Sequence, residues 1–512
     1  GGAPPRGAGG AAPPPRPPGP ARGGAPPPPP APRAPPPRPP PPRPECERGM
    51  QMNDLNIVGG TLVRPEGCLA GGLEIRDGRI ARVLKPGEAP DPAKETVNAE
   101  GMLVFPGMID SHVHIRGGKL SHREDFASGT MAAAAGGVTT VAEMPVANPP
   151  ASTEEVFLAR KAEATAAAYV DVALYGGAGA DNLEDIGRLA RQGAVAYKTF
   201  TMPPVPGREA EFYGLCSETQ DALCAVMERV APTGRLLAVH SELNQYVAAE
   251  TKRRMDAGEN GLKAFCRSRP VEAETAAVAW VIEAARKTGC RASVCHVSTP
   301  EAVKMIQAAR AEGVQVYAET CPQYILFNED TAEHAGVFAR MKPPLRDPQR
   351  MAELRRMYRD GAFAMTGSDH APYLKEEKLK NGQDIWHTFD GLPGLELSLP
   401  LLLNAVADGT LTCEAIAEAT AESTARMLGL APRKGRLAEG ADADVVLVKK
   451  NAVPVPLDIS KLFTKARESA VLYEGLPMHY TIVRTYVRGE KVFQEGTITG
   501  KQGWGTFVSP AE

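Results

Sequence analysis

The chain has 512 residues, 43% of them hydrophobic, and a formal net charge of −3. This is enough sequence for one large barrel with a smaller module beside it, or for several domains. The near-neutral charge argues against a nucleic-acid-binding protein. No stretch approaches the roughly 20 apolar residues that cross a bilayer, so we expect neither nucleic acid nor membrane as a partner.

Residues 1–49 are predicted to form a disordered, proline- and arginine-rich tail. Residues 1–44 hold 22 of the 48 prolines and six arginines but no acidic residue. With so little to bury, such a segment samples extended polyproline II conformations. It is either an appendage or translated sequence before a start at Met50 or Met52. The functional alternatives are a ligand for aromatic grooves and a targeting leader.

The nine cysteines contain no C-x-x-C pair, and no apolar segment resembles a secretory signal. Reduced thiols in a cytoplasmic protein are the expectation from this pattern. Cys295 and Cys321 stand next to residues of interest, but we expect both to be small core residues at strand ends.

Short strands at residues 56–58, 73–75 and 80–84, with turns at 59–60 and 77–78, predict the first half of a small β module over residues 50–104. Strands return after residue 434, at 444–448 and 480–487, followed by a hairpin arm at 488–493. The two terminal segments, 50–104 and 434–512, are therefore expected to pair into one β-sandwich module.

Residues 105–433 alternate between strand-like and helical segments. Apolar runs end near residues 105, 143, 174, 199, 239, 295, 319 and 366. Helical segments lie between most of them, for example at 152–168, 217–230, 271–287 and 300–311. Eight strands alternating with helices predict an α/β fold with a (β/α)8 TIM barrel. An open, doubly wound sheet is the alternative, because alternation alone does not close a barrel.

Histidines and an aspartate follow the predicted barrel strands. In extended backbone, residues two apart point to the same side, so His112 and His114 can reach one metal ion. His240, His296 and Asp369 stand at the ends of the fifth, sixth and eighth strands. Barrel active sites form at this rim, and histidine with carboxylate ligands suits zinc with a position open for water.

Lys198 ends the apolar fourth strand. An unpaired lysine inside a barrel is costly. It can extend outward to solvent, or it can lose its proton and react with carbon dioxide. The resulting carbamate would be an anionic oxygen ligand able to bridge two metal ions.

Several segments resemble the cyclic amidohydrolases, the group that contains dihydroorotase, allantoinase, hydantoinase and dihydropyrimidinase. The resemblance covers about residues 53–508. The matching segments are 107–116 (GMIDSHVHIR), 124–130 (EDFASGT), 134–140 (AAGGVTT), 240–242 (HSE), 295–298 (CHVS), 319–322 (ETCP), 342–346 (KPPLR), 368–372 (SDHAP), 393–396 (PGLE) and 435–440 (GRLAEG).

The resemblance implies a binuclear site with two divalent ions, zinc being the best match, although such ligands also accept manganese or cobalt. Two ions lower the pKa of a bridging water, and Asp369 would pass its proton to the leaving nitrogen of the opened ring. Relatives of this kind are homodimers or homotetramers. The implied ligands are His112, His114 and Asp369 for one ion, His240 and His296 for the other, and Lys198 as a bridging N6-carboxylysine.

The substrate expected from the resemblance is a small cyclic amide or ureide of the allantoin or hydantoin type. Arg116 stands at the position of the arginine that contacts the substrate carboxylate in dihydroorotases. Two positions depart from dihydroorotases: Val146 replaces asparagine after Met-Pro, with Asn148 two residues later, and Tyr373 replaces histidine after Asp-His-Ala-Pro. The candidate substrate contacts are Arg116, Asn148, Lys342 and Tyr373. Residues 374–389 fit a lid.

Two alternatives stay open. The first is a dihydroorotase of pyrimidine synthesis, which Arg116 and the segment 391–403 favour. The second is a non-catalytic, dihydropyrimidinase-related scaffold, a class in which metal ligands have been lost; the presence of all six implied ligands here argues against it.

Overall fold

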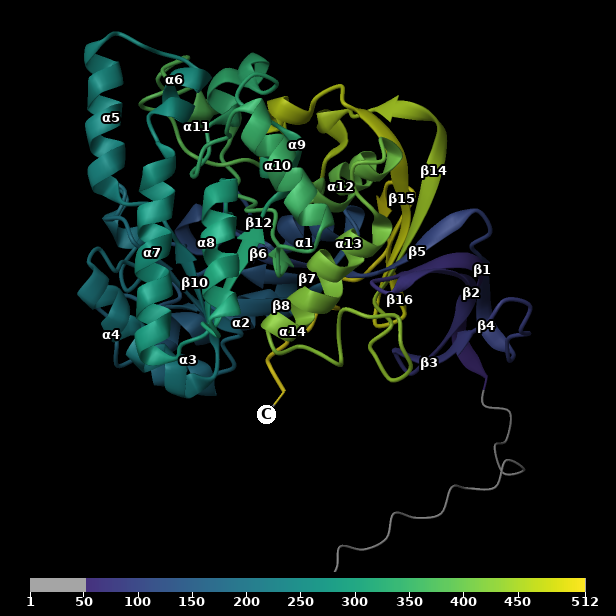
Figure 1. The fold of residues 1–512 in the computed structure, drawn as a ribbon. Coiled ribbons are helices and arrows are strands. Elements are labelled where there is room, and N and C mark those ends of the chain that lie inside the picture. Colours follow the sequence, from purple (N-terminus) through teal and green to yellow (C-terminus); the bar gives the residue numbers. More distant parts are fainter. Residues whose placement is uncertain (1–51, 512) are drawn as a thin grey trace, which may run out of the picture. The chain divides into compact units, whose positions relative to one another are not determined.

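The computed structural model describes residues 52–511, which form two sheets and the helices around them (Figure 1). The tail expected over residues 1–49 lies outside the described residues. One sheet has eight parallel strands, and the other has nine strands and is mainly antiparallel. The predicted fold, a parallel α/β barrel beside a β module built from both terminal segments, is confirmed.

Strands from both ends of the chain build the nine-stranded sheet. Its order is β17-β16-β15-β14-β5-β1-β2-β3, and β4 pairs with β1. The purple and yellow strands lie side by side in Figure 1 because β14 pairs with β5. The strands are β1 (Asn53–Arg64), β2 (Gly67–Arg76), β3 (Arg79–Leu84), β4 (Ala93–Asn98), β5 (Met102–Pro106), β14 (Val445–Pro456), β15 (Pro477–Val487), β16 (Glu490–Gln494) and β17 (Thr497–Ile498).

Two tight turns in this sheet follow directly from the sequence. Residues 77–78 connect β2 to β3 and residues 488–489 connect β15 to β16, and all four have positive φ, as a two-residue hairpin turn requires. The turn expected at residues 59–60 is wrong. Both glycines lie inside β1, where the pairing with β2 shifts register. Gly59, with φ of 75°, therefore belongs to a bulge that bends the strand without reversing it.

The eight parallel strands close into a barrel. Neighbours follow sequence order from β6 to β13. The two edges meet where the His114 backbone N–H donates to the His370 carbonyl at 2.8 Å. The strands are β6 (Met108–Val113), β7 (Val138–Glu143), β8 (Asp171–Gly177), β9 (Ala196–Phe200), β10 (Leu236–His240), β11 (Ala292–Val294), β12 (Val316–Thr320) and β13 (Met365–Thr366).

The first barrel strand differs from the predicted one. The run that ends near residue 105 is β5 of the other sheet, and the barrel begins with β6. The two strands read as one apolar run, so the pattern alone does not divide them. Gly107 separates them, and a Cβ at this position would collide with the Thr139 side chain of β7.

The helices predicted at 152–168, 217–230, 271–287 and 300–311 form as α2, α4, α7 and α8. Threonine side chains cap the N-termini of α2, α4 and α8 by accepting from a backbone N–H. The helices are α1 (Phe126–Ala135), α2 (Glu154–Ala167), α3 (Ile186–Arg191), α4 (Gln220–Val230), α5 (Asn244–Asp256), α6 (Leu262–Arg267), α7 (Val271–Thr288), α8 (Pro300–Ala311), α9 (Pro322–Leu326), α10 (Pro348–Arg359), α11 (Lys375–Lys378), α12 (Ser398–Ala407), α13 (Cys413–Ala417) and α14 (Ser423–Met427).

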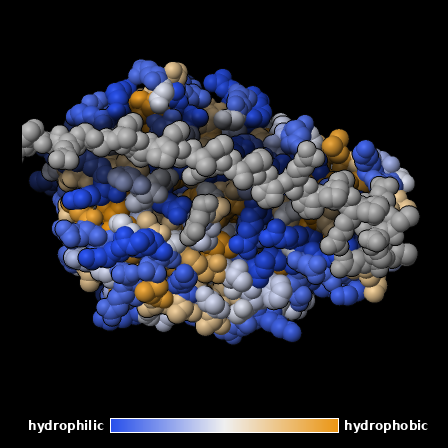
Figure 2. Space-filling model, turned by 90° about the horizontal axis from the view of Figure 1, so that it is seen from below, coloured by the Kyte–Doolittle hydropathy of each residue, from blue (hydrophilic) through white to orange (hydrophobic). Residues whose placement is uncertain are grey.

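Apolar side chains of the described residues form four buried clusters, of which two show how the fold is built. One cluster lies between the barrel strands and their helices. Another lies in the terminal sheet and combines residues from both ends of the chain, such as Ile57 and Leu447. On the face shown in Figure 2, hydrophilic side chains predominate and apolar ones form small separate patches. Within residues 52–511, no helix combines the length and the apolar character that crossing a membrane would need.

Candidate metal centre and active site

Six polar side chains meet at the carboxyl ends of the barrel strands and line one cavity of about 120 Å³. They come from five different strands, whose ends face the same rim of a closed parallel barrel. His112 and Lys198 are in β6 and β9, His240 ends β10, and His114, His296 and Asp369 follow β6, β11 and β13.

His112, His114 and Asp369 form one group of donor atoms. Asp369 Oδ1 lies 3.3 Å from His114 Nε2 and 3.4 Å from His112 Nε2. Asp369 has a left-handed backbone with φ of 47°, a conformation that costs on the order of 1–3 kcal/mol in a residue other than glycine. Asp369 lines the cavity, and residues with such a backbone are frequent at functional sites.

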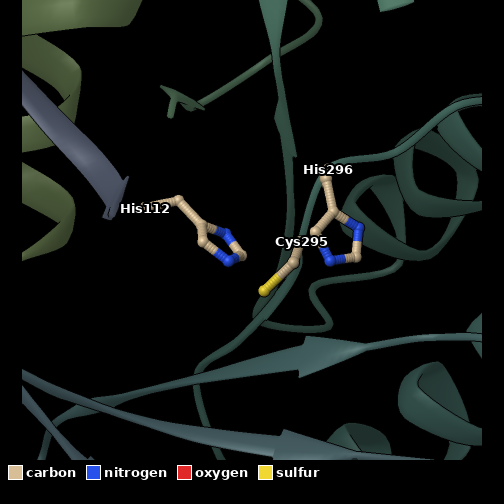
Figure 3. Close-up of side chains that lie close together, drawn as sticks. All are labelled: His112, Cys295 and His296. Atoms are coloured by element: carbon tan, nitrogen blue, oxygen red, sulfur yellow. The ribbon is translucent and has the colours of Figure 1, made fainter. Parts of the chain in front are cut away.

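His240, His296 and Lys198 lie on the other side of the cavity. His240 Nδ1 is 3.1 Å from His296 Nε2. Lys198 is completely buried, and its Nζ donates to Cys295 Sγ at 3.0 Å. Figure 3 shows the Cys295 sulfur pointing toward the His112 ring, and one donor atom of each of His112, Cys295 and His296 lies within 4.8 Å of the others. Cys295 is therefore part of this cluster as well as buried, which the sequence did not predict.

Two buried glutamates lie within hydrogen-bond distance of ring nitrogens of His112 and His240. His112 Nδ1 is 2.8 Å from Glu319 Oε1, and His240 Nε2 is 3.0 Å from Glu242 Oε2. Glu242 in turn accepts two hydrogen bonds from Arg269, at 2.8 and 2.7 Å. Carboxylates behind metal-binding histidines fix the ring orientation and raise the basicity of the ligand nitrogen.

The electrostatics of the cluster favour neutral imidazoles. Burial, together with the nearby cationic groups, lowers the pKa of His112, His114 and His296 well below the usual range. Burial also lowers the pKa of His240, against the opposing effect of Glu242. The Nε2 atoms of His112 and His114 face Asp369, and His296 Nε2 faces His240 Nδ1. Neutral imidazole nitrogens are metal ligands by type, so these residues fit a divalent ion.

Arg116 and Tyr373 both line the cavity and contact each other. Arg116 Nη2 donates to the Tyr373 hydroxyl at 3.3 Å, and both side chains are almost completely buried. The Tyr373 ring stacks on Phe389, with centroids 4.8 Å apart. Phe389 is at the end of the segment 374–389, so the expected lid contacts the cavity wall through this pair.

Lys342 lines the cavity, whereas Asn148 does not. Lys342 forms an ion pair of 2.8 Å with Asp390, and burial lowers the pKa of its ammonium group. The backbone carbonyl of Asn148 accepts from Lys119 at 3.3 Å. Val146 occupies the cavity wall in place of Asn148, so the wall is apolar at this point.

The structure adds one cation that the sequence analysis missed. Arg208 lines the cavity, and its guanidinium lies 5.7 Å from the Tyr373 ring centroid. It is paired with Glu211 at 2.6 Å. Arg208 belongs to the loop that follows β9, and loops at this end of barrel strands build active sites. A charged residue in this loop is the sequence feature that could have pointed to it. Besides Val146, the apolar lining residues are Phe200, Met202, Pro203, Val205, Phe212 and Met341.

The structure thus defines a parallel α/β barrel with a histidine-rich cluster of candidate metal ligands at the ends of its strands. Residues 103–492 match the model of the amidohydrolase family. This match covers well over half of the chain, which therefore belongs to the amidohydrolase family.

Known proteins similar to the chain include an L-hydantoinase and several allantoinases. The chain is 33% identical over 460 residues to the L-hydantoinase of Paenarthrobacter aurescens, covering 90% of this chain and 98% of that protein. It is 35% identical over 465 residues to an allantoinase of Bacillus velezensis, with the same coverage. The solved structure of L-hydantoinase (dihydropyrimidinase) from Arthrobacter aurescens superposes with a TM-score of 0.85 at 32% identity, covering 90% of this chain and 100% of that one.

Proposed function

We propose that the protein hydrolyses a ring amide bond of a small cyclic amide or ureide of the allantoin or hydantoin type. The observation that carries this proposal is the convergence of four neutral histidines, Asp369 and Lys198 in one small cavity. The size of the cavity, about 120 Å³, supports a compact ring as the substrate, since an engineered cavity of about 150 Å³ takes up benzene.

The proposed ligands of two divalent ions are those expected from the sequence, and their histidine and carboxylate chemistry suits zinc. His112, His114 and Asp369 would hold one ion, and His240 and His296 the other. Lys198, carboxylated on Nζ, would join them; its burial and its lack of a salt bridge within residues 52–511 support a role in which it becomes an anion. When bound, such a pair of ions makes a hydroxide available near neutral pH and polarises the carbonyl of an amide.

The chain itself would supply orientation and proton transfer. Asp369 Oδ1, 3.3–3.4 Å from the two histidine nitrogens, would accept the proton of the attacking water and deliver it to the leaving ring nitrogen. Arg116 and Tyr373 would orient the ring, because both line the cavity and their polar ends meet in a hydrogen bond of 3.3 Å. Val146 and the apolar lining would exclude water. The product is a ring-opened carbamoyl-type acid.

One observation favours a second candidate, dihydroorotase activity. The Arg116 guanidinium is buried, its Nε has no hydrogen-bond partner, and it forms no salt bridge with any described carboxylate. A carboxylate on the substrate would satisfy it. The apolar Val146 and the tyrosine at 373 weigh against this candidate, because they offer no further charged group to a carboxylate.

Turnover of the purified, zinc-loaded protein should be measured side by side on allantoin, hydantoin, dihydrouracil and dihydroorotate. A clear preference among the first three supports the proposal. A preference for dihydroorotate would replace it with the second candidate. Metal-loaded protein that opens none of the rings would contradict both. A cytoplasmic location and a homodimer or homotetramer, expected from the sequence, stay predictions.

A further inference from the structure

A cleft lined by three arginines lies at the end of the barrel opposite to the candidate metal centre. Arg291 directly precedes β11, and Ala364 directly precedes β13, so the cleft is at the amino ends of strands whose carboxyl ends carry candidate metal ligands. Its volume is about 490 Å³, within the range of about 300–1,000 Å³ that is typical of small-molecule sites. A molecule bound here would therefore not compete with a substrate in the cavity of the metal centre.

Cationic side chains outnumber carboxylates in this cleft. Its charged lining residues are Arg291, Arg310, Arg426 and Glu418. Glu418 pairs with Arg426, whereas Arg291 and Arg310 form no ion pair with any carboxylate among residues 52–511. Two unpaired guanidinium groups that line one cleft repel each other, and a bound anion would compensate this repulsion.

Contacts with the protein hold both unpaired guanidinium groups in place but use few of their donors. The Arg310 guanidinium lies over the Tyr317 ring, 4.2 Å from its centroid, and makes one long hydrogen bond of 3.5 Å to the Val316 carbonyl. Arg291 donates to two backbone carbonyls, at 3.2 and 3.3 Å. A guanidinium group has five N–H donors, so most donors of both groups are left for a ligand. A planar group with fixed position and spare donors suits an oxyanion.

We propose that this cleft binds a small metabolite through an oxyanion, either a phosphate or a carboxylate, between Arg291 and Arg310. Both oxyanions present pairs of oxygens that a guanidinium group binds with two parallel hydrogen bonds. The side chains of Gln307 and Ser423 line the same cleft and make no hydrogen bond to the described residues, so they would donate to further oxygens. The site is separate from the proposed reaction, because none of the residues assigned to that reaction lines the cleft.

Isothermal titration calorimetry of the zinc-loaded full-length protein tests this site, with inorganic phosphate and N-carbamoylglycine as two separate probes. N-carbamoylglycine is ring-opened hydantoin and represents the carboxylates. We expect saturable binding of at least one probe with a Kd of about 1 mM or lower, and the probe that binds identifies the type of oxyanion. In Arg310→Gln the affinity should fall at least about tenfold, because the variant loses hydrogen bonds from a charged group. Arg310 is exposed on α8, so we expect this variant to fold.

Arg286→Gln is the matched control. Arg286 is an exposed arginine in α7 that pairs with Glu312 at 2.7 Å and does not line the cleft, so its variant should bind the anion as the wild type does. Hydrogen–deuterium exchange locates the site independently, because the anion should slow exchange in residues 307–318 of the wild type but not of Arg310→Gln. Equal affinity in Arg310→Gln and wild type, as binding at the metal centre would give, overturns the inference. Lack of saturable binding of both probes also overturns it, and neither result affects the proposed reaction.

Discussion

Replacing Arg269 with glutamine should lower the metal affinity of the proposed centre, although Arg269 is not itself one of the proposed ligands. Arg269 and Glu242 are both buried and are joined by two hydrogen bonds of 2.8 and 2.7 Å. Although burial acts to raise it, the Arg269 guanidinium and the hydrogen bonds from Arg269 and His240 hold the pKa of Glu242 well below the usual range. Breaking a buried pair from one side costs about 3–5 kcal/mol, and loss of a partner behind a metal-binding histidine lowers metal affinity about 10–100-fold.

Urea unfolding of the metal-free protein and a chelator competition of the zinc-loaded protein measure the two effects separately. Arg267→Gln is the matched control, because Arg267 is an exposed arginine two residues away that pairs with Glu329 at 2.8 Å. It should change the free energy of unfolding by at most about 1 kcal/mol. The Arg269→Gln and Glu242→Gln double variant should lose less than the two single variants together. Equal metal affinity in Arg269→Gln and wild type would refute the reasoning.

Three further predictions concern single residues. Asp369→Asn should keep bound metal but lower kcat about 10²–10⁴-fold, as expected for loss of an acid–base group; turnover at the wild-type rate would contradict the assignment. Lys198→Ala should lose metal in elemental analysis, and full occupancy would exclude a bridging carbamate. Lys378 in α11 is completely buried, and burial lowers its pKa from 10.5 to about 7. Below about pH 7 Lys378 is charged in the folded protein, and burial of this charge lowers the free energy of unfolding by about 5 kcal/mol. The free energy of unfolding therefore rises with pH between about 7 and 10.5. Lys378→Met should raise the free energy of unfolding at pH 6.5 and not at pH 10.5; an equal change at both would refute this.

The local patterns of this chain predicted most of the fold. Alternating apolar positions and the Asp-Gly and Arg-Gly turns specify hairpins through backbone geometry, and threonines specify helix starts through capping. The sequence pattern led to a wrong prediction at two places. β5 and β6 read as one run across Gly107, and Gly59-Gly60 has the composition of a turn but forms a bulge. In both cases the pairing partner, which is distant in the chain, decides the outcome.

The metal-binding candidates were predictable because strand ends carry them. Their supporting residues were not, since Glu319, Glu242 and Arg269 look like ordinary charges until the barrel closes. The cavity wall was the least predictable part. Asn148 is near the site in sequence but does not line the cavity, whereas Arg208 reaches it from an irregular loop. Loop conformation has no periodic signal in the sequence.

The metal content of the purified protein tests the central claim most directly. Protein prepared with zinc and bicarbonate should hold two ions per chain in elemental analysis, and mass spectrometry under non-denaturing conditions should show the added carboxyl group. His240→Ala should reduce the content to about one ion, because it removes one ligand of a single ion. A wild-type protein that holds no tightly bound divalent ion under these conditions would contradict the account.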